Sequence, residues 1–246
     1  MSDVTQTAPS KRAPMDSLRK TALVAGLFYV LTFVSIPILV LYGPVRNDPN
    51  FIVSAASNTP ILIGGVLEII VALAGIGTAV VLFPVVKRQN EAAALGFVGT
   101  RILEAAAIVA GVVSLLSIVS LRQAGVGADG LVTGQALVAQ YNWSFHFGQS
   151  LMPAMNGLLL GSLLYRSRLV PRVLPTVGFI GAALLLVSDA AVMFGLWPQV
   201  SGLAGLFALP IALWEFSLGV YLIVKGFRPS PITVGMTTAR YQDATV

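Results

Sequence analysis

The chain has 246 residues, of which 56% are hydrophobic and only 10% are charged, and its mean hydropathy is +0.86. Because soluble domains carry about 25% charged residues, this composition excludes an ordinary soluble domain and indicates a protein that has the bilayer as its solvent. The formal net charge is +5, but the basic residues stand singly or in pairs between apolar runs, so we expect no nucleic-acid partner. The chain has no cysteine, which excludes disulfides, thiolate metal sites and cysteine catalysis.

The N-terminal part predicts a tail followed by a membrane helix. Residues 1–20 are polar and predict a disordered cytoplasmic tail. The apolar run Thr21–Leu41 is longer than the hydrophobic part of a signal peptide, and no pair of small residues spaced for cleavage ends it. We therefore expect an uncleaved first helix.

Five further apolar runs are each long enough to cross a hydrocarbon layer of about 30 Å. They are roughly Ile61–Val86, Ala92–Leu121, Asn142–Leu164, Val173–Gly195 and Leu203–Ile223. The Gly-containing stretch Arg122–Tyr141 predicts a largely non-helical external loop, with room for a short surface helix. The predicted fold class is therefore all-α: a polytopic bundle of six transmembrane helices over residues 21–225, followed by a cytoplasmic tail at residues 226–246.

The distribution of basic residues predicts the orientation. Twelve of the 15 Lys and Arg residues lie in the two tails or in the loops after the second and fourth predicted helices. Only Arg46 and Arg122 fall on the opposite side, and Arg101 lies inside a helix. Since cytoplasmic loops carry the excess of Lys and Arg, we expect both termini in the cytoplasm.

Six ionisable residues fall within the predicted spans: Glu68, Arg101, Glu104, His146, Asp189 and Glu215. A charge near the bilayer midplane costs a few kcal/mol, so each should face the bundle interior and have a partner. A rise of about 1.5 Å per residue puts Arg101 and Glu215 at similar depths, about 12–13 Å from the inner ends of their helices. We therefore expect an Arg101–Glu215 pair with Glu104 and Glu68 nearby, and these four residues form the predicted buried polar core.

A second polar set lies nearer the predicted outer face. His146, Gln149, Pro153 and Asn156 follow helical spacing along the fourth run, and Asp189 lies near the outer end of the fifth. Proline-interrupted helices and inward polar groups tend to line cavities. His146, Gln149, Asn156 and Asp189 are therefore candidate cavity-lining residues.

Three interpretations of these groups stay open at the level of sequence. The Arg101, Glu104 and Glu215 set suits a neutralised structural clamp, and it equally suits a pathway for a solute, an ion or protons. Glu68, His146 and Asp189 together could serve as metal or acid–base groups of an intramembrane enzyme. No metal-ligand spacing or cofactor-binding motif supports that third interpretation, so the sequence favours a protein that is not an enzyme, with no metal and no cofactor.

Three segments carry a resemblance to a known family: Leu82–Glu104, Leu164–Arg172 and Leu209–Pro229. In these segments the chain resembles a bacterial membrane family catalogued as domain of unknown function 4386. The resemblance implies a multi-pass protein of the bacterial inner (plasma) membrane, and it places Glu68, Arg101, Glu104 and Glu215 in the family's polar core. His146 and Asp189 match nothing in the family pattern, and the resemblance implies no substrate.

The functional hypothesis from sequence is a small permease or binding protein that handles a small solute or protons in its polar core. The alternatives are a non-catalytic scaffold or accessory subunit that binds another membrane protein, and an intramembrane enzyme that acts on lipid. The expected partner in each case is the lipid bilayer, and a homo-oligomer is compatible with all of them.

Overall fold

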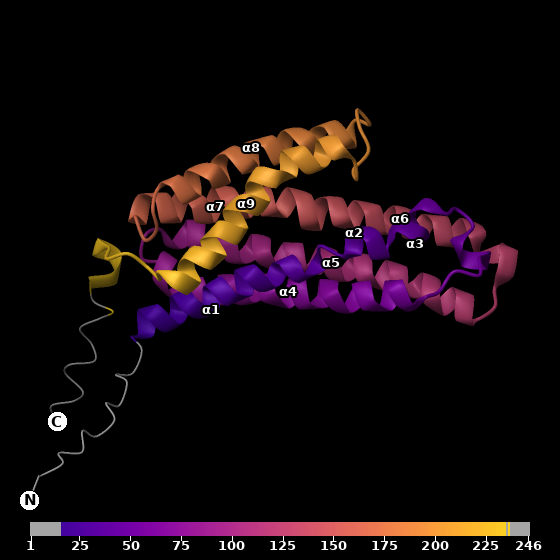
Figure 1. Cartoon of the computed structure of the whole chain (residues 1–246), viewed down its shortest axis with the longest axis horizontal. Helices are drawn as coiled ribbons and strands as arrows, with labels where there is room; N and C mark the ends of the chain where they lie inside the picture. The colour runs from indigo at the N-terminus through magenta and orange to yellow at the C-terminus, as the bar shows by residue number, and fades with distance from the viewer. Residues whose placement is uncertain (1–15, 235, 237–246) are drawn as a thin grey trace, which may run out of the picture.

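The computed structural model describes residues 16–234 and 236, and within these residues the secondary structure is entirely helical. Figure 1 shows the long helices running side by side along one axis, with both ends of the described chain at the same end of the molecule. The long helices are α1 (Ser17–Leu31), α4 (Thr59–Val86), α5 (Glu91–Gln123), α6 (Leu131–His146), α7 (Met152–Ser167), α8 (Val173–Met193) and α9 (Gly202–Val224).

Five helical segments within the described residues have the length and apolar composition to cross a membrane. They are Ser17–Leu41, Thr59–Val86, Glu91–Gln123, Val173–Met193 and Gly202–Val224. These segments make the chain a multi-pass membrane protein. The predicted fourth span, Asn142–Leu164, falls on α6 and α7, which have 16 residues each and are joined by a π-helical turn at Phe147–Leu151.

The first predicted helix is longer at its start than expected and broken near its end. It begins at Ser17 instead of Thr21, and α1 gives way at Leu31 to a 3₁₀ turn, Thr32–Ser35, which precedes the short helix α2 (Ile38–Leu41). Pro37 explains the break, because proline has no amide hydrogen to donate to the carbonyl of Phe33. That carbonyl instead accepts from the Ile36 amide at 3.2 Å.

The expected external loop Arg122–Tyr141 is mainly helical, so that expectation is wrong. Helix α6 begins at Leu131, and Gly134 and Tyr141 on it are buried. A Cβ atom on Gly134 would lie 3.2 Å from the Ile52 side chain, which shows how closely α6 approaches the 3₁₀ turn Phe51–Val53. This tertiary packing stabilises helix in a stretch whose glycines alone indicate a loop.

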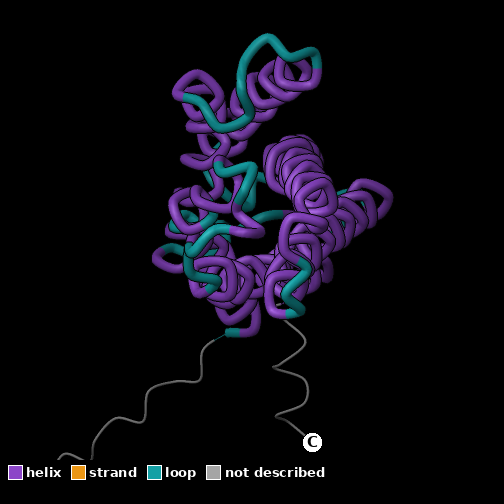
Figure 2. The backbone as a smooth tube through the Cα atoms, turned by 90° about the vertical axis from the view of Figure 1, so that its right-hand side faces the viewer, coloured by secondary structure: helices purple, strands orange, loops and turns teal. Residues whose placement is uncertain are grey.

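Glycines allow α9 to pack closely against its two neighbouring helices, α1 and α8. A Cβ atom on Gly26 of α1 would lie 2.6 Å from the Gly219 carbonyl oxygen of α9, and one on Gly181 of α8 would lie 2.5 Å from the Ile211 amide nitrogen. Viewed along the long axis, the far end of the α8–α9 hairpin stands apart from the other helices (Figure 2). Helix α9 therefore packs on α1 at the end near the chain termini and diverges from it toward the other end.

The predicted C-terminal tail, residues 226–246, contributes to the fold as far as it is described. The Arg228 amide donates to the Leu169 carbonyl at 2.8 Å, and the Ser230 hydroxyl donates to the Ser167 carbonyl at 2.6 Å. Of the tail expected at residues 1–20, residues 1–15 lie outside the part of the chain that the structure describes. Ser17–Lys20 form the first turn of α1.

Candidate functional site

The centre of the bundle holds a buried ion cluster built on Arg101. Helix α5 places Arg101 and Glu104 one turn apart, and Arg101 Nη1 lies 2.9 Å from Glu104 Oε2. Arg101 Nη2 lies 2.9 Å from Glu215 Oε1 of α9, so the structure contains the Arg101–Glu215 pair that helix depth predicts. The Arg101 residue is only 1% exposed. With all three groups ionised, this cluster carries one more negative than positive charge.

The two carboxylates of the cluster differ in how fully they are bonded. Glu104 Oε2 also accepts from Asn156 Nδ2 at 2.6 Å, and the Asn156 Oδ1 atom in turn accepts from the Thr100 hydroxyl at 2.5 Å. Glu215 bonds Arg101 through Oε1, and its other oxygen makes no hydrogen bond to a described residue. The side chain of Glu215 is 14% exposed. Glu215 therefore has bonding capacity left for another molecule, and so does Arg101, whose buried Nε has no hydrogen-bond partner among the described residues.

Glu68 forms a separate cluster, in contrast to the expectation that it lies beside Arg101. Its carboxylate accepts from the hydroxyls of Tyr42 at 3.0 Å and Tyr141 at 3.3 Å, and from Gln149 Nε2 at 2.6 Å. Arg101 instead faces Gly75, whose added Cβ atom would lie 3.9 Å from the guanidinium. Gly75 lies 11 residues before the end of α4 at Val86, and Arg101 lies 10 residues after the start of α5 at Glu91, so the two residues are at the same depth. Glu68 lies two helical turns, about 10 Å, further from the loop that joins α4 and α5.

A π-helical turn directs two neighbouring side chains to different partners. Gln149 donates to Glu68 of α4, whereas the Ser150 hydroxyl donates to Asp189 Oδ1 of α8. Pro153 accounts for the local change of helix type, because it has no amide hydrogen to donate to the carbonyl of Gln149. Single π-helical turns inside α-helices are frequent at functional sites.

Two buried polar groups beside this turn have unfilled hydrogen-bonding capacity. His146 is 1% exposed, and neither ring nitrogen has a hydrogen-bond partner within the described residues. Its ring meets those of Trp143 and Phe147 edge to face, with centroids 5.7 and 5.5 Å away. The Asp189 Oδ2 atom is also buried and unpartnered among the described residues. Because buried polar groups in proteins are nearly always hydrogen-bonded, these atoms indicate a place where another molecule can bond.

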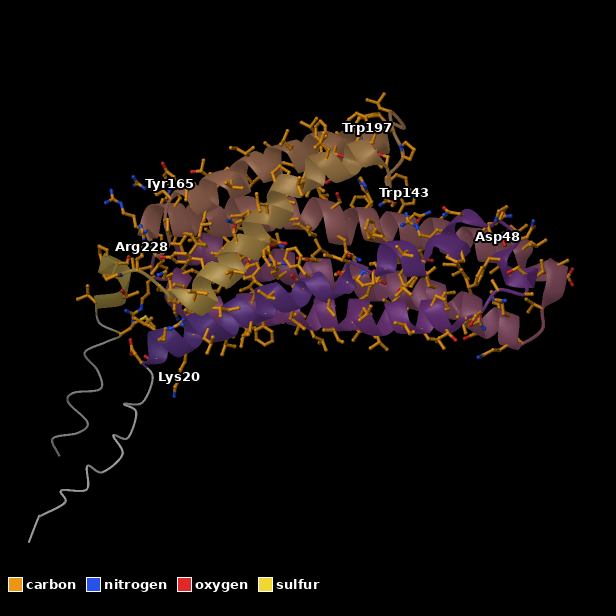
Figure 3. The ribbon with its side chains drawn as sticks, viewed as in Figure 1. Lys20, Asp48, Trp143, Tyr165, Trp197 and Arg228 are labelled. Carbon is orange, nitrogen blue, oxygen red and sulfur yellow. The ribbon has the colours of Figure 1, made fainter. Side chains whose placement is uncertain are left out.

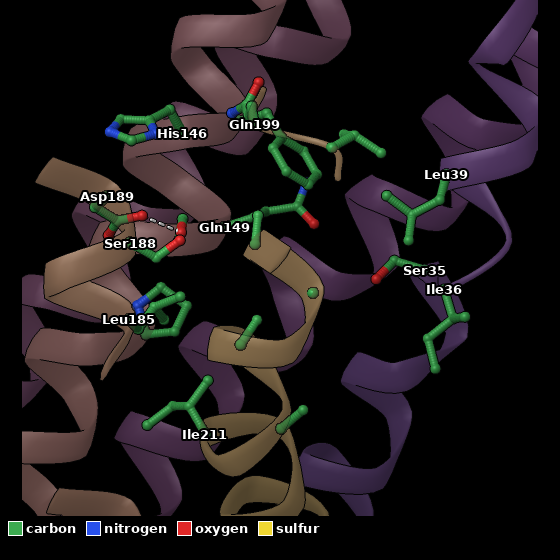
Figure 4. A pocket seen from close by; sticks show the side chains of 18 of the residues that line it. Ser35, Ile36, Leu39, His146, Gln149, Leu185, Ser188, Asp189, Gln199 and Ile211 are labelled. Atoms are coloured by element: carbon green, nitrogen blue, oxygen red, sulfur yellow. Dashed lines mark hydrogen bonds between the residues drawn. The ribbon is translucent and has the colours of Figure 1, made fainter. Parts of the chain in front are cut away.

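These two regions border one cavity of about 380 Å³. Arg101, Glu104 and Glu215 line one part of it, and His146, Gln149 and Asp189 line another. Figure 4 shows His146, Ser188 and Asp189 along one side of the pocket, with Ile36 and Leu39 across from them. The expectation that Asn156 lines a cavity is not met, since Asn156 is fully buried beside Glu104, and Glu68 is also outside the lining.

Several residues at this site are missing from the sequence-based prediction. Ser150 lines the cavity because the π-helical turn redirects it, and an ideal helix gives no signal for that. Gln199 also lines the cavity and donates to the Asn142 carbonyl at 3.0 Å, while Arg46 Nε donates to Asn142 Oδ1 at 2.9 Å. These bonds tie the loop between α8 and α9 to α6 and to the short helix α3 (Gly43–Asn47).

The carboxylates and the histidine do not assemble as a metal site. Among the residues that the structure describes, no group of three or more His, Cys, Asp or Glu side chains is placed to hold a metal ion. Glu68 points to the Tyr42–Tyr141–Gln149 donors, and Asp189 bonds Ser150 instead. Glu68 and Asp189 are therefore held by different partners, and the His146 ring bonds neither of them.

Comparison with known families gives the class of the protein. A family model described as domain of unknown function (DUF4386) matches residues 24–226. The chain belongs to this family. The DUF4386 match spans every residue that lines the cavity, from Thr32 to Glu215. No curated protein and no solved structure matches the chain.

Proposed function

We propose that this DUF4386 protein is a six-span protein of the bacterial inner membrane that binds a small solute in its cavity, as a permease or a binding protein. The observation that carries the proposal is the juxtaposition of a 380 Å³ cavity with the buried Arg101–Glu104–Glu215 cluster. Small-molecule sites commonly occupy about 300–1,000 Å³ and combine apolar walls with a few convergent polar groups. A purely structural clamp has no need of an adjoining cavity.

The proposed topology counts α6, the π-helical turn and α7 as one further span. Their backbone is helical without interruption from Leu131 to Ser167, which at about 1.5 Å per residue exceeds the thickness of a bilayer. Figure 3 shows Lys20, Tyr165 and Arg228 toward one end of the molecule, which we take as the cytoplasmic end. Trp143 and Trp197 lie at a similar level in the other half, as residues of an outer interfacial belt do.

Reporter fusions test this topology. A reporter joined after Lys225 is expected to be cytoplasmic, and one inserted beside Asp129 is expected to be external, because the basic residues concentrate on the Lys225 side. Paired alkaline phosphatase and green fluorescent protein fusions give opposite readouts for the two compartments. Detection of both fusion sites on the same side of the membrane contradicts the six-span arrangement.

Substitution of Glu215 tests solute binding. Glu215→Gln keeps the side-chain volume and an acceptor oxygen for Arg101, and Arg101 retains Glu104 as its counter-charge. We therefore expect Glu215→Gln to stay folded in detergent and to lose about tenfold or more in affinity for a solute that stabilises the wild type, since hydrogen bonds to charged groups contribute about 1.5–3 kcal/mol. The measurement is the ligand-dependent shift in melting temperature over a panel of small solutes, with flux into vesicles for each solute that binds.

Glu91→Gln supplies the matched control, because Glu91 is exposed in the first turn of α5, far from the cavity. The control is expected to keep wild-type affinity. If no solute shifts the melting temperature of the wild type and none crosses the vesicle membrane, the solute-binding proposal is wrong.

A scaffold function has one supporting observation. Ala204, Ala208 and Ala212 follow each other at intervals of four residues on α9, a spacing that commonly lets membrane helices pack closely. This face borders the cavity, although Ala208 also packs against the hydrophobic core. Co-purification of a stoichiometric membrane partner, lost on Ala208→Leu, together with an absence of solute binding, would favour the scaffold.

A further inference from the structure

We propose that the solute is an amphipathic cation, an organic amine with an apolar tail, which enters the cavity sideways from the outer leaflet between the break in the first span and the outer half of α9. This inference rests on the proposed function and names its substrate class and its route. Three features of the cavity carry it: its wall is incomplete, the side nearest the gap is mainly apolar, and the opposite side has more carboxylates than cationic side chains.

The cavity wall is incomplete between the first span and α9. Ile36 and Leu39 line the cavity, yet they are 61% and 47% exposed. On α9, a Cβ atom on Gly205 would have no atom within 4 Å, and Gly205 also lines the cavity. The two helices touch at Gly26 and Gly219, toward the end near the chain termini. They also touch at the Phe33 and Phe216 rings, whose centroids lie 5.3 Å apart. The gap therefore lies beyond Phe33, beside Ile36 and Leu39, where a transmembrane protein meets lipid tails.

The side of the cavity nearest this gap is apolar and suits a hydrocarbon tail. It is formed mainly by Phe33, Ile36 and Leu39 of the first span and Ala208 of α9. The Thr32 and Ser35 hydroxyls also line it, but they donate to the carbonyls of Tyr29 and Thr32 in the same segment. Small residues such as Ala208 commonly allow close helix contact, but here their face borders the cavity and leaves room for a ligand. A tail that comes from the bilayer can enter this space without crossing water.

Among the described residues, the opposite side of the cavity carries three carboxylates, Glu104, Asp189 and Glu215, and one cationic side chain. Asp189 Oδ2 is buried without a hydrogen-bond partner among the described residues, and Glu215 has one oxygen that bonds none of them. Arg101 is the one Lys or Arg side chain in the described lining; its two Nη atoms bond Glu104 and Glu215, and its buried Nε has no partner among the described residues. An anionic headgroup would meet three carboxylates here, whereas an ammonium group can donate to the open carboxylate oxygens.

Asp189 is the expected anchor for the ammonium group. The Ser150 hydroxyl holds Oδ1, which fixes the carboxylate and leaves Oδ2 open. His146 lies on the same side of the pocket as Asp189, with both ring nitrogens unpartnered in the described part of the chain (Figure 4). A neutral imidazole can accept one further N–H from the amine, so a primary amine can satisfy both groups at once.

The test uses the full chain in phosphatidylcholine nanodiscs and a probe series of equal chain length. Octylamine, octanol and octanoate differ in headgroup charge, and ethylamine keeps the amine without the tail. Octylamine is expected to raise the melting temperature at concentrations about tenfold or more below those required by octanol, since hydrogen bonds to charged groups contribute more than neutral ones. Octanoate and ethylamine are expected to bind more weakly still.

Two pairs of variants separate the anchor from the route. Asp189→Asn is expected to weaken octylamine binding about tenfold and to leave octanol binding unchanged, with exposed Asp129→Asn as the control.

Gly205→Leu is expected to slow octylamine association several-fold, because the new side chain projects into the gap. Gly202→Leu, one turn earlier on α9 and also in open space, is the control and should leave association unchanged.

The outcomes distinguish this inference from the proposed function. Equal or tighter binding of octanoate, or tight binding confined to short hydrophilic solutes, overturns the amphipathic cation while the solute-binding proposal stands. An unchanged association rate in Gly205→Leu overturns the lateral route. If neither the octyl probes nor the solute panel affects the wild-type protein, both the proposed function and this inference fail. The wild-type probe series decides the substrate class even if Asp189→Asn does not fold.

Discussion

Arg101→Ala is expected to lower the free energy of unfolding by about 3–5 kcal/mol, because it leaves buried carboxylates without their cation. Glu104 and Glu215 both bond the Arg101 guanidinium, and Arg101 also lies over the Tyr29 and Phe97 rings at 5.3 and 5.7 Å. The same substitution therefore removes two ion pairs and the contacts of the guanidinium with two aromatic rings. Equilibrium unfolding of the purified protein in mixed micelles of mild and denaturing detergent measures the change.

Glu215→Ala is expected to cost less than Arg101→Ala, since Arg101 then still has Glu104 as its counter-charge. The double variant Arg101→Ala, Glu215→Ala should be more stable than the sum of the two single losses predicts, because it removes one uncompensated carboxylate. Exposed Arg166→Ala is the control and should lie within about 0.5 kcal/mol of the wild type. Strictly additive losses would show that the contact between Arg101 and Glu215 makes no energetic contribution.

Gly181→Ala is expected to destabilise the protein by about 1–3 kcal/mol, although alanine is the better helix former. The added methyl group would lie 2.5 Å from the Ile211 amide nitrogen and 2.7 Å from the Ile211 Cα atom. Because these are backbone atoms of α9, the contact can be relieved only by moving the two helices apart. Such a movement would also displace Glu215, which follows Ile211 by one turn on α9.

Gly99→Ala provides the matched control for this steric argument. Gly99 also lies inside a long helix, α5, but a Cβ atom there would have no atom within 4 Å. We expect Gly99→Ala to be neutral or to stabilise the protein by up to about 1 kcal/mol, as the gain in helix propensity predicts. Thermal unfolding of both variants in the same detergent gives the comparison. A Gly181→Ala protein as stable as Gly99→Ala would show that α8 and α9 do not pack as closely as described.

The amino-acid sequence by itself determined the class of the protein and the central contact of its site. Apolar runs of about 20 residues cross a bilayer whatever their neighbours are, so the all-helical membrane fold follows from composition and run length. The Arg101–Glu215 pair was also predictable, because a charge inside a span needs a partner and helix rise fixes its depth. Membership of the DUF4386 family follows from the sequence as well.

Only the tertiary structure decided how the polar residues divide into clusters. Glu68 was expected near the Arg101–Glu215 pair, but counting from the loop between α4 and α5 puts Gly75 level with Arg101. That Glu68 bonds Tyr42 instead is visible only in the assembled helices. Sequence periodicity gives the face of a helix on which a residue lies and its approximate depth. Depths on α4 and α5 compare only when both are counted from the loop between Val86 and Glu91, and the residues that bond a given side chain from other helices are not part of that count.

The cavity likewise depends on local departures from regular helix that need tertiary packing to persist. Pro37 and Pro153 mark where amide donors are missing, yet a proline alone does not specify whether the chain kinks, tightens into a 3₁₀ turn or widens into a π-helical turn. The Ser150–Asp189 and Gln149–Glu68 bonds accompany the π-helical turn at Phe147–Leu151. Because those partners come from α8 and α4, far away in the sequence, the open side of Asp189 became visible only once the helices were assembled.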